Sequence, residues 1–363
     1  MKNLLYIIDS LGVGGAEKLL VDTILASPEY LKITVVYLYK PHTLVPLLNG
    51  TEVIFLNLQG YLHKISAVTR LRNIIVSHKI DIVHAHLFWS TILARLACPK
   101  NVKLFFSVHS IISSDVFRGN KLLSILEKVT YLQRHTAIFV SNTVKEDYII
   151  HVGLKGPSYV LYNFVEEEFY LKRKERLREF NGLSQMRLVS VGNLKPSKNY
   201  QLLINIFRNL KSEPITLDIF GEGYYSNHLR KMLTQNQIVN IKLKGQHLKI
   251  FEVLADYDIF IMPSENEGFC IAVAEAMASG LPCILADIKT FREISGNNAL
   301  FFSLRKPQEL FNYLKNIKEL SYQLKENASK ASVLAENFRI KRYMEELQKI
   351  YYANVFGSVD RSV

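Results

Sequence analysis

Two glutamates that stand eight residues apart, Glu267 and Glu275, carry the clearest chemical signal in the chain. Glu275 falls among alanine and methionine residues on a stretch that reads as a helix ending at Gly280. A carboxylate on an apolar helix is costly unless a partner meets it. Paired hydroxyls of a ligand could be that partner, and an internal ion pair is the structural alternative.

Glu267 lies in the loop that leads into the same helix. The residues after it, Gly268, Phe269, Cys270 and Ile271, begin that helix and present free backbone amides there. Carboxylate and amides therefore face the same space and could together hold a polar ligand. A helix-start acid favoured by the helix dipole is the alternative for Glu267.

A glycine-rich turn follows the first expected strand, in the segment 12–17 that reads GVGGAE. Gly14 and Gly15 would let the backbone approach a ligand, and the N-terminus of the next helix attracts phosphate. The turn departs from the dinucleotide fingerprint because Glu17 replaces its third glycine, and the second strand lacks the ribose-binding acid. A nicotinamide cofactor is thus disfavoured, and a simple tight turn is the alternative.

A second loop of this kind, residues 191–199, reads VGNLKPSKN. Lys198 stands at the entrance of a helix, where a cation opposes the helix dipole unless an anion binds beside it. A diphosphate would suit that position, and a solvated loop lysine is the alternative.

Histidines provide a third group of candidates. His84 and His86 point to one face of an expected strand and could line a ligand cleft, or else be satisfied core histidines. No third ligand with zinc spacing accompanies them. No metal site is therefore expected, and the D-x-D sequence at 256–258 is interpreted as capping chemistry.

The elements that must position these residues are alternating strands and helices. Short apolar runs, such as 3–9, 32–39, 81–86 and 103–109, predict strands buried on both faces, with helical patterns between them. The pattern pauses in a charged stretch and then restarts at 187. Such alternation predicts an α/β protein with two Rossmann-like parallel-sheet domains facing across a cleft.

The expected domain boundaries follow from this pattern. Residues 1–165 are expected to form an N-terminal domain, 166–185 a linker, and 186–338 a C-terminal domain. Residues 339–363 form a helix and tail that could pack back on the N-terminal domain.

Composition restricts the class of protein. The chain has 363 residues, of which 48% are hydrophobic and 21% charged, as in a globular protein of about two domains. Three cysteines without metal spacing fit a reduced compartment. We find neither a signal-peptide core nor a run long enough to span a membrane, so a cytoplasmic location is expected. The net charge of +12 favours phosphorylated ligands or an anionic surface.

The motifs in their order and spacing resemble family 4 glycosyltransferases of the GT-B fold. The matching pieces are the glycines before Glu17, the loop from Gly192 to Lys198, the segment 220–223, and Glu267 with Glu275 as the E-x7-E element. The resemblance covers nearly the whole chain and is weakest at 110–135 and 165–185. It specifies the family far better than the substrate.

The resemblance implies roles for the two domains and for individual residues. Residues 1–165 would form the acceptor-side domain, with His84 and His86 as acceptor-side candidates, and residues 186–338 the nucleotide-sugar-binding domain. Gly14 and Gly15 would face the donor phosphates, and Lys198 would hold the diphosphate. Glu267 and the amides of Gly268 to Ile271 would contact the donor sugar, and Glu275 would bind the ribose. Leu243 and Gly245 would border the base, and His109 would lie near the reacting centre. His109, Glu267 and Lys198 are thus the catalytic candidates. Asn193 stands where the family often has arginine and is kept as a donor-binding candidate.

The implied activity is a hexosyltransferase reaction. A hexose-type sugar would pass from a nucleoside-diphosphate sugar, such as a UDP-sugar, to a glycan or lipid-linked acceptor with retention of configuration. The setting would be synthesis of lipopolysaccharide or another bacterial surface polysaccharide, with no cofactor or metal. Alternatives are an epimerase or hydrolase of the same fold, or a non-catalytic nucleotide-sugar-binding protein.

Two further partner classes are weighed. Basic, partly apolar stretches at 61–78 and 117–134 could rest on an anionic membrane surface, giving a peripheral association with the inner face of the cell membrane. Ordinary surface helices are the alternative. Nucleic acid is not expected because no recognition module is present.

Overall fold

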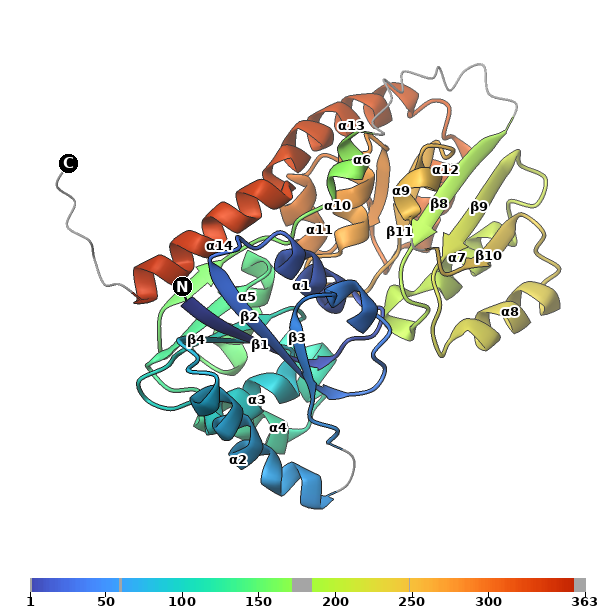
Figure 1. Cartoon of the computed structure of the whole chain (residues 1–363). Helices are drawn as coiled ribbons and strands as arrows, with labels where there is room; N and C mark the ends of the chain where they lie inside the picture. Colours follow the sequence, from blue (N-terminus) through green and yellow to red (C-terminus); the bar gives the residue numbers. More distant parts are fainter. Residues whose placement is uncertain (1, 59–60, 172–184, 248, 356–363) are drawn as a thin grey trace, which may run out of the picture. The chain divides into compact units, whose positions relative to one another are not determined.

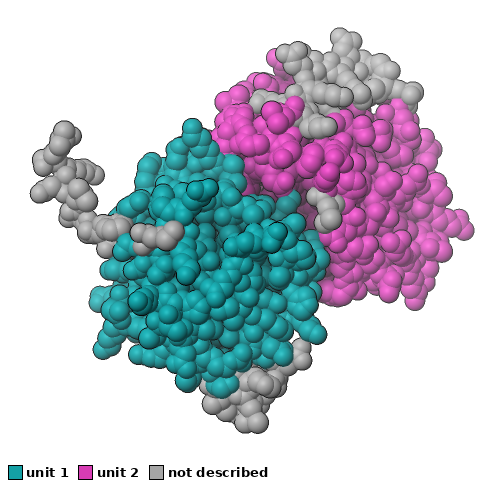
Figure 2. All heavy atoms as spheres, in the orientation of Figure 1, with its two compact units in different colours: residues 1–163, 340–363 teal, residues 164–339 magenta. Residues whose placement is uncertain are grey.

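The computed structural model describes residues 2–58, 61–171, 185–247 and 249–355. The chain forms two compact units, coloured separately in Figure 2: Met1–Asn163 with Ile340–Val363, here called unit 1, and Phe164–Arg339, here called unit 2. The sequence boundaries at 165 and 338 lie within two residues of these limits. Most of the expected 166–185 linker and the tail beyond 355 lie outside the described residues.

Unit 1 is built on a seven-stranded sheet with the order β3-β2-β1-β4-β5-β6-β7, and all its strand pairs are parallel. Its strands are β1 (Lys2–Ser10), β2 (Leu31–Tyr39), β3 (Glu52–Phe55), β4 (Ile82–His86), β5 (Lys103–Val108), β6 (His135–Phe139) and β7 (Ser158–Val160). Every residue of β4 and β6 is buried, as expected for central strands covered on both faces.

Helices connect these strands (Figure 1). They are α1 (Gly15–Leu25), the 3₁₀ turn η1 (Val45–Leu48), α2 (Tyr61–Ser77), α3 (Phe88–Ala97), the π-helix η2 (Ile112–Phe117), α4 (Lys121–Thr130), α5 (Asn142–His151) and α14 (Ile340–Val355). Side-chain caps fix two of the starts: Asn120 accepts from the amides of Leu122 and Leu123, and Ser141 accepts from Val144.

Helix α14, the red helix of Figure 1, belongs to unit 1 although it comes last in the sequence. The hydroxyl of Tyr351 lies 3.2 Å from that of Tyr6 and 2.7 Å from His84 Nδ1. Asn354 adds contacts to Thr136 and Tyr159. The last described helix is therefore attached to the first sheet by buried polar contacts.

Unit 2 has a six-stranded parallel sheet with the order β10-β9-β8-β11-β12-β13. Its strands are β8 (Met186–Val191), β9 (Ile215–Phe220), β10 (Ile241–Gly245), β11 (Ile259–Met262), β12 (Cys283–Ala286) and β13 (Leu300–Phe302). Its helices are α6 (Glu167–Leu171), η4 (Pro196–Lys198), α7 (Tyr200–Phe207), α8 (Ser226–Gln235), α9 (Ile250–Leu254), α10 (Ile271–Ala278), α11 (Lys289–Ser295), α12 (Pro307–Lys315), α13 (Ser321–Ala335) and η5 (Glu336–Phe338).

The start of the expected linker is a packed helix rather than an exposed segment. In α6, Phe169 is fully buried, and its ring lies 5.9 Å from that of Phe251. Tyr170 donates a 2.8 Å hydrogen bond to the carbonyl of Ala335. The dense charges around these two aromatic residues conceal them from a reading of composition alone.

Each sheet reverses its strand order once, between β1 and β4 in unit 1 and between β8 and β11 in unit 2. Ligands of open α/β sheets bind beyond the carboxyl ends of the strands at such reversal points. The loops after these four strands are therefore the places to look for a site. Within the described part of the chain, no helix is long and apolar enough to cross a bilayer.

Candidate active site

In unit 2, Lys198 and Glu267 meet at the reversal point of the sheet. Lys198 ends the short turn η4 after β8, and Glu267 lies in the loop after β11. Lys198 Nζ donates a 2.7 Å hydrogen bond to Glu267 Oε1, and Ser264 Oγ donates another of 2.7 Å to the same oxygen. Thr290 fixes the loop from below by donating to the main-chain carbonyl of Glu267 at 2.7 Å.

The charge on Lys198 is held in a buried place, since only 9% of the residue is exposed. Burial alone would lower the pKa of Lys198, but Cys270 and the Glu267 carboxylate raise it above its ordinary value. The ammonium is thus permanent at neutral pH and already in position. A fixed cation of this kind can stabilise negative charge that develops on a leaving group.

Helix α10 begins beside this pair with an unusual backbone. Its N-cap, Cys270, has a φ of +65°, the left-handed conformation that side chains other than glycine rarely adopt. Such conformations persist only where the surrounding structure enforces them, and they gather at functional sites. No side chain caps the helix start.

The other expected donor residues fall around the same helix and loop. Glu275 is 9% exposed, and Phe269 is only 2% exposed with its ring packed 5.3 Å from that of Phe338. The side chain of Phe269 is therefore structural, and only its backbone could contact a ligand. Asn193 is exposed on the loop before Lys198.

Glycines let two loops of unit 2 pack directly on each other. A Cβ atom on Gly221, whose φ is +141°, would overlap the carbonyl of Gly192, and one on Gly223 would overlap that of Leu194. Gly245, at a φ of +74°, ends β10 after a register shift and accepts a hydrogen bond from the Gly221 amide. Leu243, two residues earlier, is half-buried.

In unit 1, the histidines separate into two kinds. His84 is 1% exposed, and both its ring nitrogens are engaged, by Tyr351 and by Ser107 Oγ at 2.8 Å. Burial lowers the pKa of His84 to about 3. Of the two interpretations kept for His84, the geometry fits the satisfied core histidine and not a residue that contacts an acceptor.

His86 and His109 form a pair at the ends of β4 and β5. His86 Nδ1 lies 3.0 Å from His109 Nε2. Burial lowers the pKa of His109 to about 4, so its imidazole is neutral at pH 7. Among the described residues, His109 Nδ1 and His86 Nε2 have no hydrogen-bond partner. His109 is half-buried and lines the cavity described below.

The glycine turn of unit 1 carries a carboxylate of its own. Gly14 is the N-cap of α1, and a Cβ atom on it would overlap the carboxylate of Glu17. Glu17 also accepts a 3.2 Å hydrogen bond from Ser10 Oγ. The Glu17 carboxylate therefore lies beside Gly14, one of the two glycines that the sequence analysis expects to face the donor phosphates.

Two family models match most of the chain. Residues 13–169 match the family described as Glycosyltransferase Family 4, and residues 173–333 match the one described as Glycosyl transferases group 1. The chain is a family 4 glycosyltransferase. The resemblance inferred from the motifs is confirmed, and so is the enzyme class, which favours sugar transfer over the epimerase, hydrolase and binding-protein alternatives.

Relatives of this glycosyltransferase include two bacterial enzymes. It is 22% identical to N-acetyl-alpha-D-glucosaminyl L-malate synthase of Bacillus anthracis over 309 residues, which is 80% of this chain and 79% of that protein. It is 25% identical to the O-antigen chain mannosyltransferase RfbU of Salmonella typhimurium over 229 residues, 61% of this chain and 60% of that one.

Solved structures share its fold. Anabaena HepE in complex with UDP superposes with a TM-score of 0.82 at 19% identity, over 97% of this chain and 100% of that one. The expected fold class, two parallel-sheet α/β domains of the GT-B type, is confirmed.

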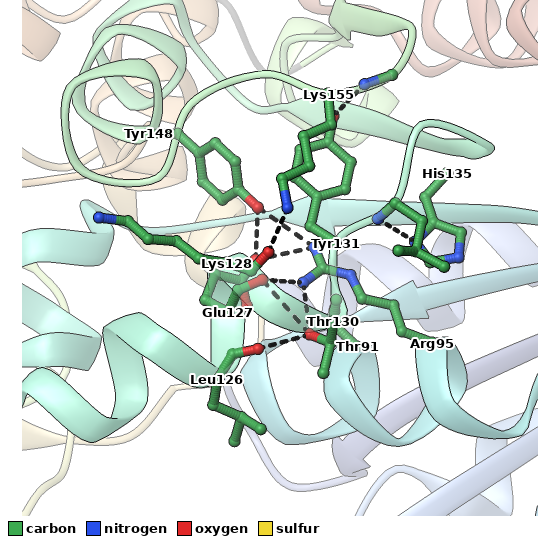
Figure 3. A network of polar contacts seen from close by, with 12 residues as sticks. Thr91, Arg95, Leu126, Glu127, Lys128, Thr130, Tyr131, His135, Tyr148 and Lys155 are labelled. Carbon is green, nitrogen blue, oxygen red and sulfur yellow. Dashed lines mark hydrogen bonds and ion pairs between the residues drawn. The ribbon is translucent and has the colours of Figure 1, made fainter.

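Three acidic residues of the glycosyltransferase were missed by the sequence analysis. Asp9, Asp115 and Glu127 line a cavity of about 320 Å³ in unit 1. Glu127 lies in a network with Arg95 and Tyr148, drawn in Figure 3. Single acids without a motif give no signal in a sequence, and only the position of Asp9 directly after an apolar run hinted at the end of a strand.

No group of three His, Cys, Asp or Glu side chains that could hold a metal ion occurs among the residues that the structure describes. Asp258 of the D-x-D sequence accepts a 2.8 Å hydrogen bond from the amide of Arg187 and returns one from its own amide. It thus joins the starts of β8 and β11, as the capping interpretation expects.

Proposed function

We propose that this glycosyltransferase moves a hexose-type sugar from a nucleoside-diphosphate sugar to a glycan or lipid-linked acceptor with retention of configuration. The observation that carries the proposal is the buried Lys198–Glu267 pair at the sheet reversal of unit 2. A permanent cation there suits the diphosphate of a donor. Structural neighbours solved with UDP and with UDP-glucose support a nucleotide-sugar donor of this class.

Each residue would have a defined part in the reaction. Lys198 meets the negative charge of the departing nucleoside diphosphate, and Glu267 accepts hydroxyls of the donor sugar. Glu275 binds the ribose, while Gly268 to Ile271 contribute backbone amides. His109 orients the reacting groups as a neutral imidazole. The departing phosphate takes the proton of the acceptor hydroxyl, which attacks from the same face, and no metal takes part.

A thermal-shift panel tests donor binding. Wild type and Glu275→Ala are heated with UDP, GDP, ADP, CMP and the corresponding sugars. A ligand at 100 times its Kd stabilises the fold by about 2.7 kcal/mol, which gives a readable rise in Tm. We expect one nucleoside-diphosphate series to shift wild type, and the shift to shrink in the variant. Equal shifts in both proteins would remove Glu275 from the donor site.

We further propose that the enzyme works at an anionic membrane surface, on the cytoplasmic side. Helix α4 exposes Leu122, Ile125 and Val129 along one face, at 75%, 54% and 63% exposure. Lys121 and Lys128 flank this face and are exposed. Apolar residues beside lysines are the composition of helices that lie in the headgroup region of anionic bilayers.

Vesicle co-sedimentation tests this surface. Wild type should bind phosphatidylglycerol vesicles and leave phosphatidylcholine vesicles free, and Ile125→Asp should reduce the binding about tenfold. Val239→Asp is the matched control, because Val239 is 79% exposed in unit 2. Equal loss of binding in both variants would count against α4 as the contact.

A further inference from the structure

The cavity of unit 1 lies at the carboxyl ends of the strands where the sheet order reverses. Asp9 comes from the end of β1, Trp89 from the start of α3 after β4, and His109 from the loop after β5. The π-helix η2 and helix α4 complete the wall through Asp115 and Glu127. Its volume of about 320 Å³ falls in the lower part of the range for small-molecule sites.

The cavity is acidic although the whole chain is basic. Three carboxylates line it, and none of its lining residues, all of which the structure describes, is a lysine or arginine. Ionised carboxylates only accept hydrogen bonds, so they suit ligand groups that donate. A phosphate or carboxylate ligand would meet the like charges of Asp9 and Asp115 here, whereas the charge of Glu127 is paired with the buried Arg95.

Glu127 is built into this wall rather than placed on it. The residue is 2% exposed, and its Oε1 receives Arg95 Nη2 at 2.8 Å and the Tyr148 hydroxyl at 2.5 Å. Figure 3 shows both groups converging on it. Its second oxygen, Oε2, is buried and has no hydrogen-bond partner among the described residues. A buried acceptor without a donor is costly, and a ligand hydroxyl would supply one.

Asp9 is held in a similar manner at another side. Its Oδ1 accepts from the amide and the hydroxyl of Ser90, at 2.7 and 2.6 Å. These bonds join the end of β1 to the start of α3, so the carboxylate has a fixed position in the cavity wall. The amide of Trp89 also donates to the Asp9 carboxylate.

An aromatic wall stands beside these acids. Trp89 lines the cavity and is 45% exposed, with the ring of Phe88 edge-on at 5.2 Å. Leu87, just before them, has a φ of +70°. Strained backbone of this kind is found where function requires a fixed geometry, and here it starts the helix that presents both rings. A flat apolar face next to hydrogen-bond acceptors matches a sugar ring.

We propose that this cavity binds the reacting end of the acceptor as an uncharged, hydroxyl-bearing sugar ring, and that its carboxylates exclude phosphorylated or acidic acceptors. This inference rests on the proposed function, since it specifies the acceptor of that reaction. Trp89 stacks on the ring, Glu127 and Asp115 accept its hydroxyls, and His109 Nδ1 meets a further polar group at the cavity rim.

Tryptophan fluorescence tests the proposal directly, because Trp89 is the single tryptophan of the chain. The protein is titrated with methyl glycosides of glucose, galactose, mannose and N-acetylglucosamine, and with glucose 1-phosphate and glucuronic acid. At least one neutral glycoside should change the emission with saturation, and the two anionic sugars should bind at least tenfold more weakly. Anionic sugars that bind as tightly as neutral ones would overturn the proposal.

Asp115→Asn keeps the fluorophore and the shape of the wall while removing one charge. It should weaken binding of the neutral glycoside about tenfold and reduce the ratio between the affinities for the neutral glycoside and for glucose 1-phosphate. Glu29→Gln, an exposed residue of the same unit outside the cavity, is the control and should bind like wild type. Unchanged discrimination in Asp115→Asn would contradict the role of its charge.

The donor thermal shift is recorded on the same samples. A nucleotide shift without any fluorescence response to the whole sugar panel would overturn the cavity as acceptor site and leave the proposed function standing. A sugar response without any nucleotide shift would count against the proposed donor instead.

Discussion

Replacing Lys198 by methionine separates phosphate recognition from the rest of donor binding. The substitution keeps much of the length of the side chain and removes a cation that lies 2.7 Å from Glu267 Oε1. A charge-assisted hydrogen bond contributes about 1.5–3 kcal/mol, which corresponds to about 10- to 150-fold in Kd. We expect Lys198→Met to lose this factor for a nucleoside diphosphate and to bind the bare nucleoside like wild type.

Substitution of the partner, Glu267→Gln, should have the opposite effect on the affinity for the nucleoside diphosphate. It removes a carboxylate that is paired with the Lys198 ammonium and that repels an incoming diphosphate. Because a carboxylate and a phosphate repel each other, affinity for the free diphosphate should rise in Glu267→Gln. Turnover should nevertheless fall, because the hydroxyls of the donor sugar lose the Glu267 carboxylate that accepts their hydrogen bonds.

Isothermal titration calorimetry with the nucleoside diphosphate selected by the thermal-shift panel, and with its nucleoside, measures both effects. Lys198→Met leaves a buried acid without its cation, so its stability should drop by about 3–5 kcal/mol. The double variant with Glu267→Gln should recover stability but not phosphate affinity. Wild-type diphosphate affinity in Lys198→Met, or equal losses for diphosphate and nucleoside, would refute the assignment.

Three further predictions concern other parts of the two units. Glu275→Ala should raise the donor KM about tenfold or more, with a smaller change in kcat, in steady-state kinetics; an unchanged KM would exclude ribose binding by this residue. Burial depresses the pKa of His84 to about 3 and of His109 to about 4, so between these values and 6.5 the unfolded chain binds more protons and stability falls with falling pH. Between pH 6.5 and 5.5 each of these two histidines should lower the free energy of unfolding by about 1 kcal/mol, as measured by urea unfolding. His109→Gln should remove the contribution of His109; an unchanged dependence of stability on pH in that variant would contradict the burial of His109 as a neutral imidazole. Gly221→Ala should weaken nucleotide binding at least tenfold because its methyl group displaces the neighbouring loop. Gly119→Ala, also at a positive φ (+79°) but with open space around it, should bind normally; matching losses would point to general strain.

The sequence predicts the parts of this enzyme that depend on local pattern. Continuous apolar runs such as those of β1 and β4 identify buried strands, because a strand covered on both faces has no polar side. Loop composition and spacing likewise place Lys198 and Glu267 after strands of one sheet. These features depend only on residues close together in the chain. The family inferred from the motifs is confirmed by the two family models.

What the sequence does not predict are contacts between distant segments. The bond from Ser90 to Asp9 spans 81 residues, and the one from Tyr351 to His84 spans 267. The partner of a polar residue depends on strand order, which no periodicity encodes. His84 therefore looks like a ligand residue in the sequence although it is a core residue. The cavity acids escape notice for the same reason, since Glu127 becomes significant only when Arg95 and Tyr148 meet it.

The central claim is sugar transfer from a nucleoside-diphosphate sugar with Lys198 receiving the leaving diphosphate. We would incubate wild type and Lys198→Met with the donor selected by the thermal-shift panel and the neutral glycoside that alters Trp89 emission. Proton NMR would then follow the anomeric signals. We expect acceptor-dependent release of the nucleoside diphosphate, a new glycoside with the anomeric configuration of the donor, and a rate lower by about 10²–10³ in the variant. Turnover by Lys198→Met at the wild-type rate, or donor cleavage that does not depend on an acceptor, would contradict it.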